Sequence, residues 1–83
     1  MSKYGPITKF LQDQPSQIND LTVSFGTLEG LISDKLPESA YTYQAWWGNE
    51  KNKGRSQARS WMEAGWKVDS VDFSKLRVRF KKE

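Results

Sequence analysis

The amino-acid sequence predicts one α+β domain, residues 1–83, of winged-helix-like architecture. We expect three main helices, a C-terminal antiparallel β-hairpin, a possible third short strand and a short helical insertion. Three observations lead to this class: apolar residues recur at helical spacing early in the chain, they alternate with a period of two at its end, and the cations gather in its second half.

The first elements are a helix and a short strand. The helix is expected over residues 6–13 (PITKFLQD), because Pro6 suits a first helical position and an apolar stripe follows at i, i+3, i+4, made by Ile7, Phe10 and Leu11. Residues 21–25 (LTVSF) have the composition of a strand.

The second helix and the insertion come next. Ser24 is the expected cap of a helix over residues 25–33, whose apolar side would hold Phe25, Leu28, Leu31 and Ile32. Ser39 is the expected cap of a further helix over residues 39–47, with Ala40, Tyr43 and Trp47 on one face.

The two adjacent tryptophans of that insertion cannot face the same way. Neighbouring residues of a helix lie about 100° apart around its axis. We therefore assign Trp47 to the core and expect Trp46 to be half exposed.

The third main helix is predicted over residues 56–64 (SQARSWMEA), after a polar loop at 49–55. Ser56 would cap it and Gly65 would end it. Its apolar stripe is Ala58, Trp61 and Met62, and its opposite side holds Ser56, Arg59, Ser60 and Glu63, with Gln57 at the boundary.

The last elements form a hairpin. In residues 75–81 (KLRVRFK), Leu76, Val78 and Phe80 alternate with four cations, Lys75, Arg77, Arg79 and Lys81. Residues 66–73 supply the partner strand, with a turn near Asp72–Ser74. Apart from the insertion at 39–49, the order is that of a winged helix, in which the third helix enters the DNA major groove and the hairpin lies against the backbone.

Composition argues against an enzyme. The chain has no histidine and no cysteine, so it lacks the commonest general base, the commonest metal ligand and any thiolate. No phosphate-loop, dinucleotide or metal motif is present, and the carboxylates lack ligand spacing. We expect no cofactor and no metal.

Charge separates the two halves of the chain. Residues 1–50 carry three cations and six acids, net −3, whereas residues 51–83 carry ten cations and four acids, net +6. This asymmetry indicates nucleic acid, a membrane surface or an acidic protein as partner, or only a solvated face. No run approaches the ~18 apolar residues of a membrane span, and no secretory signal is apparent, so a cytoplasmic protein is expected.

DNA is the preferred partner, because the most basic segments coincide with the third helix and the hairpin. The loop, helix and strand cations would give about six phosphate contacts and a log–log salt slope of about −5. Trp46 could stack on a base, and Asn49 and Gln57 could read adenine. The candidate contact residues are Trp46, Asn49, Lys51, Lys53, Arg55, Gln57, Arg59, Ser60, Arg77 and Arg79.

Purely structural roles and other functions remain open as interpretations of the same residues. The tryptophans could simply fill a small core, and the amides could cap helices or tie the loop to backbone groups. A protein-interaction module or inhibitor that uses exposed Trp and Arg is the alternative function, and an RNA or single-strand binder is the third.

Several motifs resemble an uncharacterised family of small bacterial and phage domains. The matching residues follow the pattern LPxSA, AWWxN and QAxxWxxAGWxV, and are Leu36, Pro37, Ser39, Ala40, Ala45, Trp46, Trp47, Asn49, Gln57, Ala58, Trp61, Ala64, Gly65, Trp66 and Val68, preceded by Phe25, Leu28 and Glu29. The resemblance implies a single compact domain and carries no activity. The role of a regulator or accessory factor belongs to the DNA-binding hypothesis.

Overall fold

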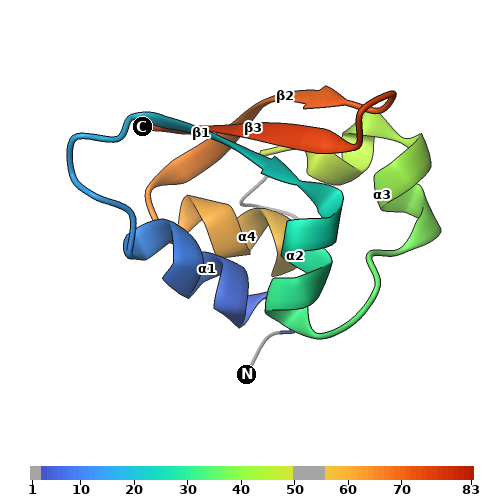
Figure 1. Ribbon diagram of the computed structural model, residues 1–83, viewed down its shortest axis with the longest axis horizontal. Coiled ribbons are helices and arrows are strands. Elements are labelled where there is room, and N and C mark those ends of the chain that lie inside the picture. The colour runs from blue at the N-terminus through green and yellow to red at the C-terminus, as the bar shows by residue number, and fades with distance from the viewer. Residues whose placement is uncertain (1–2, 50–55) are drawn as a thin grey trace.

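The computed structural model describes residues 3–49 and 56–83 and has an α+β fold (Figure 1). Its elements are α1 (Gly5–Gln12), β1 (Asp20–Ser24), α2 (Phe25–Ile32), α3 (Glu38–Thr42), the 3₁₀ helix η1 (Gln44–Trp47), α4 (Ser56–Met62), β2 (Trp66–Asp72) and β3 (Arg77–Lys82). The α+β class, the C-terminal hairpin and the short third strand are therefore confirmed. The side chain of Ser56, expected as a cap, lies outside the described residues.

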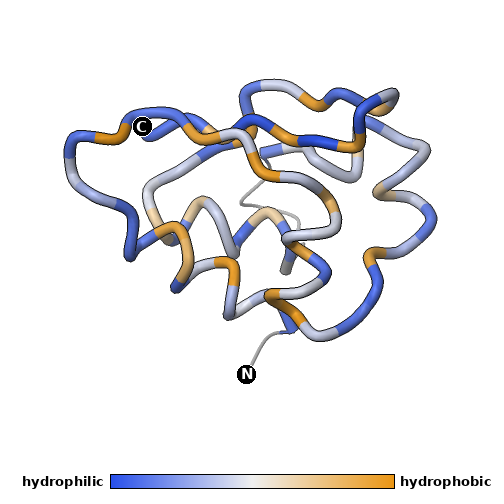
Figure 2. Tube along the Cα trace, in the orientation of Figure 1, coloured by the Kyte–Doolittle hydropathy of each residue, from blue (hydrophilic) through white to orange (hydrophobic). Residues whose placement is uncertain are grey.

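The sheet is antiparallel with the order β1-β3-β2. Helices α1, α2 and α4 cover one of its faces, and the other face is open to solvent (Figure 1). The alternation of hydrophobic and hydrophilic residues along β3, coloured orange and blue in Figure 2, sets this arrangement. Val78 and Phe80 are fully buried, while Arg77, Arg79 and Lys81 are exposed. The element order and the strand order are compatible with a winged helix.

A bulge in β2 decides which of its side chains reach the core. Val68 lies opposite Phe80, but Ser70, not Asp69, lies opposite Arg79, so the register shifts between them. The extra residue changes the alternation, because two residues of β2 now oppose one of β3. Val68 and Val71, three positions apart, consequently both face the helices.

Aromatic rings occupy the centre of the core. Trp47 stacks between Phe25 and Trp61, with ring centroids 5.0 and 5.9 Å away, and Trp61 continues to Phe80 at 5.7 Å. The indole Nε1 of Trp47 donates to the carbonyl of Ala40 at 2.9 Å, so its polar atom is satisfied. The assignment of Trp47 to the core is confirmed.

The insertion differs from the single helix expected over residues 39–47. The chain breaks at Tyr43, which has extended angles (φ −116°, ψ 122°), and Pro37 rather than Ser39 precedes α3. Tyr43 is 63% exposed and does not share a buried face with Ala40 and Trp47. The break sets η1 apart from α3, and Trp47 then enters the core from η1.

The hairpin turn also differs from expectation. The alternation in residues 75–81 predicts that Leu76 faces the core with Val78 and Phe80, but Leu76 has a positive φ of 54°, is 41% exposed and precedes β3. Its carbonyl accepts from the amide of Phe25 at 2.9 Å, which fixes the turn against the start of α2. Gly65, which was expected to end the third main helix, has φ 82°, a conformation that glycine adopts without strain.

Glu29 fastens α2 to the segment that leads into α3. Its carboxylate accepts from the hydroxyl of Tyr41 at 2.7 Å and from the amide of Leu36 at 2.9 Å. The Tyr41 hydroxyl first, and then the Leu36 amide, lower the pKa of Glu29 below its usual 4.5.

This arrangement predicts an acid-dependent loss of stability. A carboxyl whose pKa is lowered in the folded state stabilises the fold above its unfolded pKa and loses that contribution as the pH falls through the folded value. Thermal unfolding between pH 7 and pH 3 should therefore show a smaller loss for Glu29→Gln than for the parent. Equal losses in the two proteins would contradict this role for Glu29.

Candidate nucleic-acid interface

The outward side of α4 is smaller than the sequence indicated. Ser60 is 4% exposed, and the prediction that it projects into solvent is wrong. Its hydroxyl donates to the carbonyl of Gln57 at 2.6 Å, and its own carbonyl accepts from the Thr8 hydroxyl at 2.7 Å. Helix α1 packs against this side of α4 and removes Ser60 from the surface.

The two candidate adenine readers are engaged within the fold. The Asn49 Oδ1 accepts from Trp61 Nε1 and from the Val68 amide, and its Nδ2 donates to the Val68 carbonyl, all at 2.9 Å. Gln57 Nε2 donates to the carbonyl of Trp46 at 3.4 Å. These bonds agree with the structural interpretation of the two amides, in which they tie the loop to backbone groups, rather than with adenine recognition.

Trp46 is half buried, as expected for the second of the paired rings. It meets the edge of Trp47, with centroids 4.6 Å apart, and Tyr4 at 6.1 Å. The ring therefore packs against the aromatic core and leaves only part of its surface for a partner.

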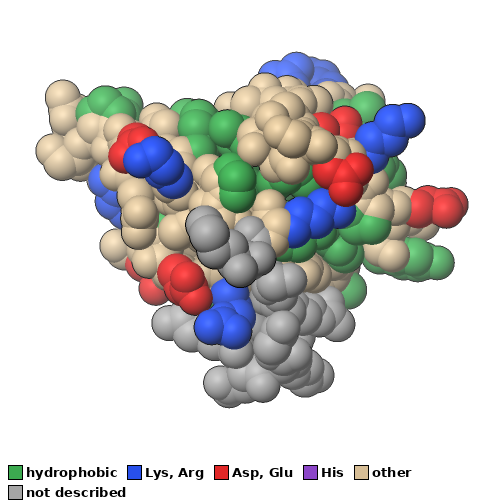
Figure 3. Space-filling model, turned by 90° about the horizontal axis from the view of Figure 1, so that it is seen from below, with side chains coloured by type: hydrophobic (Ala, Val, Ile, Leu, Met, Phe, Trp, Pro, Cys, Tyr) green, Lys and Arg blue, Asp and Glu red, His purple; other side chains and the backbone are tan. Residues whose placement is uncertain are grey.

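The described cations separate onto two sides of the molecule. Arg59 is exposed on α4, where it forms an i,i+4 ion pair with Glu63 at 3.5 Å. The helical side shows dispersed basic side chains with acidic ones near them (Figure 3). Arg77 and Arg79 belong to the opposite, open face of the sheet, and Lys51, Lys53 and Arg55 lie outside the described residues.

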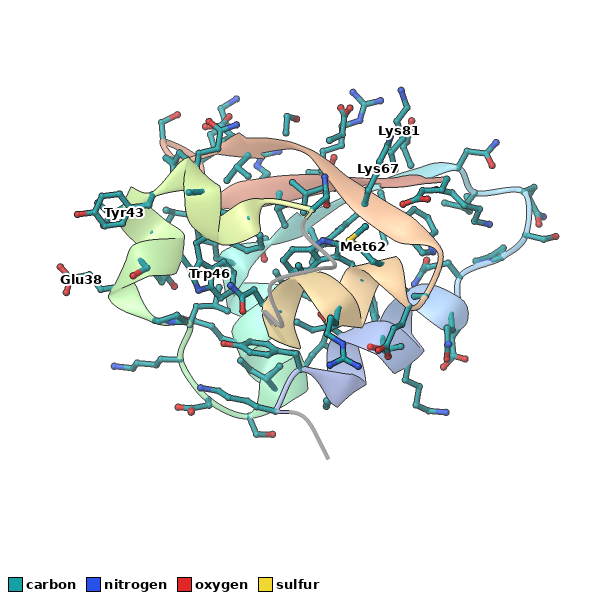
Figure 4. The ribbon with its side chains drawn as sticks, turned by 180° about the vertical axis from the view of Figure 1, so that it is seen from behind. Glu38, Tyr43, Trp46, Met62, Lys67 and Lys81 are labelled. Carbon is teal, nitrogen blue, oxygen red and sulfur yellow. The ribbon has the colours of Figure 1, made fainter. Side chains whose placement is uncertain are left out.

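The open sheet face carries more cations than the sequence analysis selected. Lys67 of β2 lies directly opposite Lys81 of β3, and both point away from the helices (Figure 4). Together with Arg77 and Arg79 they form what we call the outer-face cations. Lys81 was already on the charged side of the alternating segment, whereas Lys67 could be found only from the strand register.

Acidic side chains neutralise this face only in part. Arg79 pairs with Asp20 at 3.0 Å and with Asp69 at 3.9 Å. The carboxylate of Asp72 turns to the hairpin loop, where the Ser74 hydroxyl and the amides of Lys75 and Ser74 lower its pKa. Lys67, Arg77 and Lys81 form no ion pair with any described acid.

Two further features concern metal ions and membranes. Within residues 3–49 and 56–83, no cluster of three acidic side chains could hold a metal ion. None of the helices formed by the described residues combines the length and apolar character needed to cross a bilayer.

Comparison with known proteins gives one match. A protein-family model with the description "Domain of unknown function (DUF7662)" matches residues 4–83. No curated protein and no solved structure matches the chain significantly.

Proposed function

We propose that this chain, which belongs to the family described as Domain of unknown function (DUF7662), is a non-enzymatic DNA-binding domain that holds the phosphate backbone with its hairpin. The observation that supports this best is the group of outer-face cations, of which Lys67, Arg77 and Lys81 have no acidic partner among the described residues. Cations in such positions attract a polyanion without first breaking an internal ion pair.

The hairpin is a better contact surface than α4. Arg59 is the exposed side chain among the described ones of α4, it pairs with Glu63 just beyond the end of the helix, and Ser60 is buried. A helix with so few free polar groups offers little for reading base edges. We therefore expect contacts chiefly to phosphates, which set position and affinity more than sequence preference.

A salt titration with one double variant tests this function. Binding of a fluorescent duplex should weaken with a log–log salt slope of about −3, if the three unpaired outer-face cations, Lys67, Arg77 and Lys81, each neutralise one phosphate. In the double variant Arg77→Gln/Lys81→Gln the slope should become less negative by about 2, and the affinity at low salt should decrease by roughly tenfold or more. Both residues are exposed, so the fold should be preserved.

The matched control is Lys9→Gln, which removes an exposed cation of α1 that lies on the helical side. It should bind the duplex like the parent. Absence of binding at about 50 mM salt, or an equal loss in the control, would remove the proposal.

A protein-interaction module is the second candidate, because Tyr43 and Leu76 are the large hydrophobic side chains that remain exposed among the described residues. Aromatic and aliphatic groups of this kind anchor protein interfaces. A partner retained by the immobilised protein after nuclease treatment, and lost with Tyr43→Ala, would favour this function over DNA.

Single-stranded nucleic acid is less favoured. Binding of single strands depends on bases stacked on aromatic rings, and the outward residues of the described strands include no aromatic side chain. Duplex DNA should therefore compete better than a single strand of equal length, as measured by displacement of the labelled duplex.

A further inference from the structure

A hollow of about 190 Å³ opens on the outer face of the sheet, over all three strands. It is lined by Thr22, Ser70, Asp72, Lys75, Arg77 and Arg79. The register explains why these side chains meet, since Thr22 of β1 and Ser70 of β2 both lie opposite Arg79 of β3. Side chains on one face of paired strands stand about 5 Å apart.

The arginines of the hollow have different surroundings. Arg79 is held by Asp20 at 3.0 Å and by Asp69 at 3.9 Å, so its guanidinium has a fixed orientation. Arg77, two positions earlier on the same face, forms no ion pair with a described acid, and neither does Lys75. Asp72 lies opposite Arg77 in the strand register and interacts electrostatically with Lys75, but neither cation is held in an ion pair with it, so both can still bind an anion.

The remaining lining groups suit a tetrahedral oxyanion. Two hydroxyls, from Thr22 and Ser70, can donate from either side of the central strand. The only acid of the lining, Asp72, already accepts three hydrogen bonds from Ser74 and Lys75 at 2.8–3.0 Å, so its Oδ1 is directed to the turn. Because Arg79 is already paired with Asp20 and Asp69, Lys75 and Arg77 are the lining cations that remain available to an anion.

From this geometry we propose that the hollow is a seat for one phosphate group, with Arg77 and Lys75 as its charged ligands and Thr22 and Ser70 as its hydroxyl donors. The proposal rests on the proposed function in naming the phosphate as one of the DNA backbone. An Arg fork binds two phosphate oxygens at once, whereas Lys acts as a point charge. Phosphate binding at this seat would thus hold the hairpin at a defined position on the DNA backbone, which nonspecific electrostatic attraction alone does not do.

Inorganic phosphate is the probe that tests the seat without DNA. Its titration into ¹⁵N-labelled protein at constant ionic strength, with chloride as the reference anion, should give saturable shifts at the backbone amides of Thr22 and Ser70 and at Arg77 Nε. Thr22→Val keeps the shape of the side chain, and Arg77→Lys keeps its charge. Each should weaken phosphate binding by about three- to tenfold, as expected for the loss of one ordinary hydrogen bond at a solvent-exposed site.

The control is Thr42→Val, which removes an exposed hydroxyl from α3 and should leave the titration unchanged. The proposed phosphate site would be refuted if chloride produced the same shifts. It would also be refuted if Thr22→Val and Arg77→Lys bound phosphate as tightly as the parent. If duplex binds while phosphate gives no local shifts, the seat is refuted and the DNA proposal stands. If phosphate saturates the seat while duplex does not bind, the seat is supported and the DNA proposal fails.

Discussion

Replacing Trp47 with alanine should lower the free energy of unfolding by about 3–5 kcal/mol, the range for deleting a fully buried tryptophan. The ring is 2% exposed and lies between Phe25 and Trp61, so its loss opens a cavity between two other large side chains. Natural domains have about 0.05–0.15 kcal/mol of stability per residue. For a chain of 83 residues this gives roughly 4–12 kcal/mol in total, so the loss ranges from about a quarter of the stability to all of it, and the variant should unfold at a much lower urea concentration.

Trp46→Ala is the matched control, because it removes the same side chain one residue earlier. Trp46 is half buried and meets its neighbours through ring edges, so we expect a loss of about 1–2 kcal/mol from reduced apolar burial. Urea unfolding followed by far-UV circular dichroism measures both changes without using the deleted fluorophores. Equal destabilisation by the two variants would refute the unequal burial of the pair.

The elements that could be predicted from sequence are those with a strong local pattern. The alternation of Val78 and Phe80 with arginines specifies both the strand and its buried face, and the Ser24 hydroxyl caps α2 by accepting from Thr27 at 3.1 Å. The break at Tyr43 and the outward Leu76 could not be found in this way. Each depends on a tertiary contact, namely the burial of Trp47 and the bond from the Phe25 amide to Leu76.

The candidate site was harder to predict for the same reason. A helical projection of α4 placed Ser60 beside Arg59, but whether that side meets solvent depends on where α1 packs. Likewise, the partnership of Lys67 with Lys81 follows from strand pairing and the bulge at Asp69. Charge could be located along the chain, but its distribution over two faces required the fold.

Replacing Asn49 with alanine should lower the free energy of unfolding by about 2–3 kcal/mol, although this residue is exposed at the surface. Its amide pairs with both backbone groups of Val68, as a neighbouring strand would, and so occupies part of the free edge of β2. Its third bond satisfies the indole N–H of Trp61, a residue with no solvent exposure. Without Asn49 that donor is buried and unpaired.

A comparison with Gln57→Ala separates this role from base reading. Gln57 makes one long bond of 3.4 Å, so its loss should cost less than about 1 kcal/mol. If Asn49 instead served only to read adenine, Asn49→Ala would leave urea unfolding unchanged and alter only the sequence preference for DNA.

A double-mutant cycle locates the origin of the Asn49 effect. Trp61→Phe removes the indole N–H and retains an aromatic ring, so in that background Asn49→Ala no longer leaves a buried donor unpaired. We expect the cost of Asn49→Ala to shrink by about 1 kcal/mol or more, within the range for residues in direct contact. If the cost stays the same, the stabilisation comes from the two bonds to Val68, and Asn49 would serve chiefly to close the edge of β2.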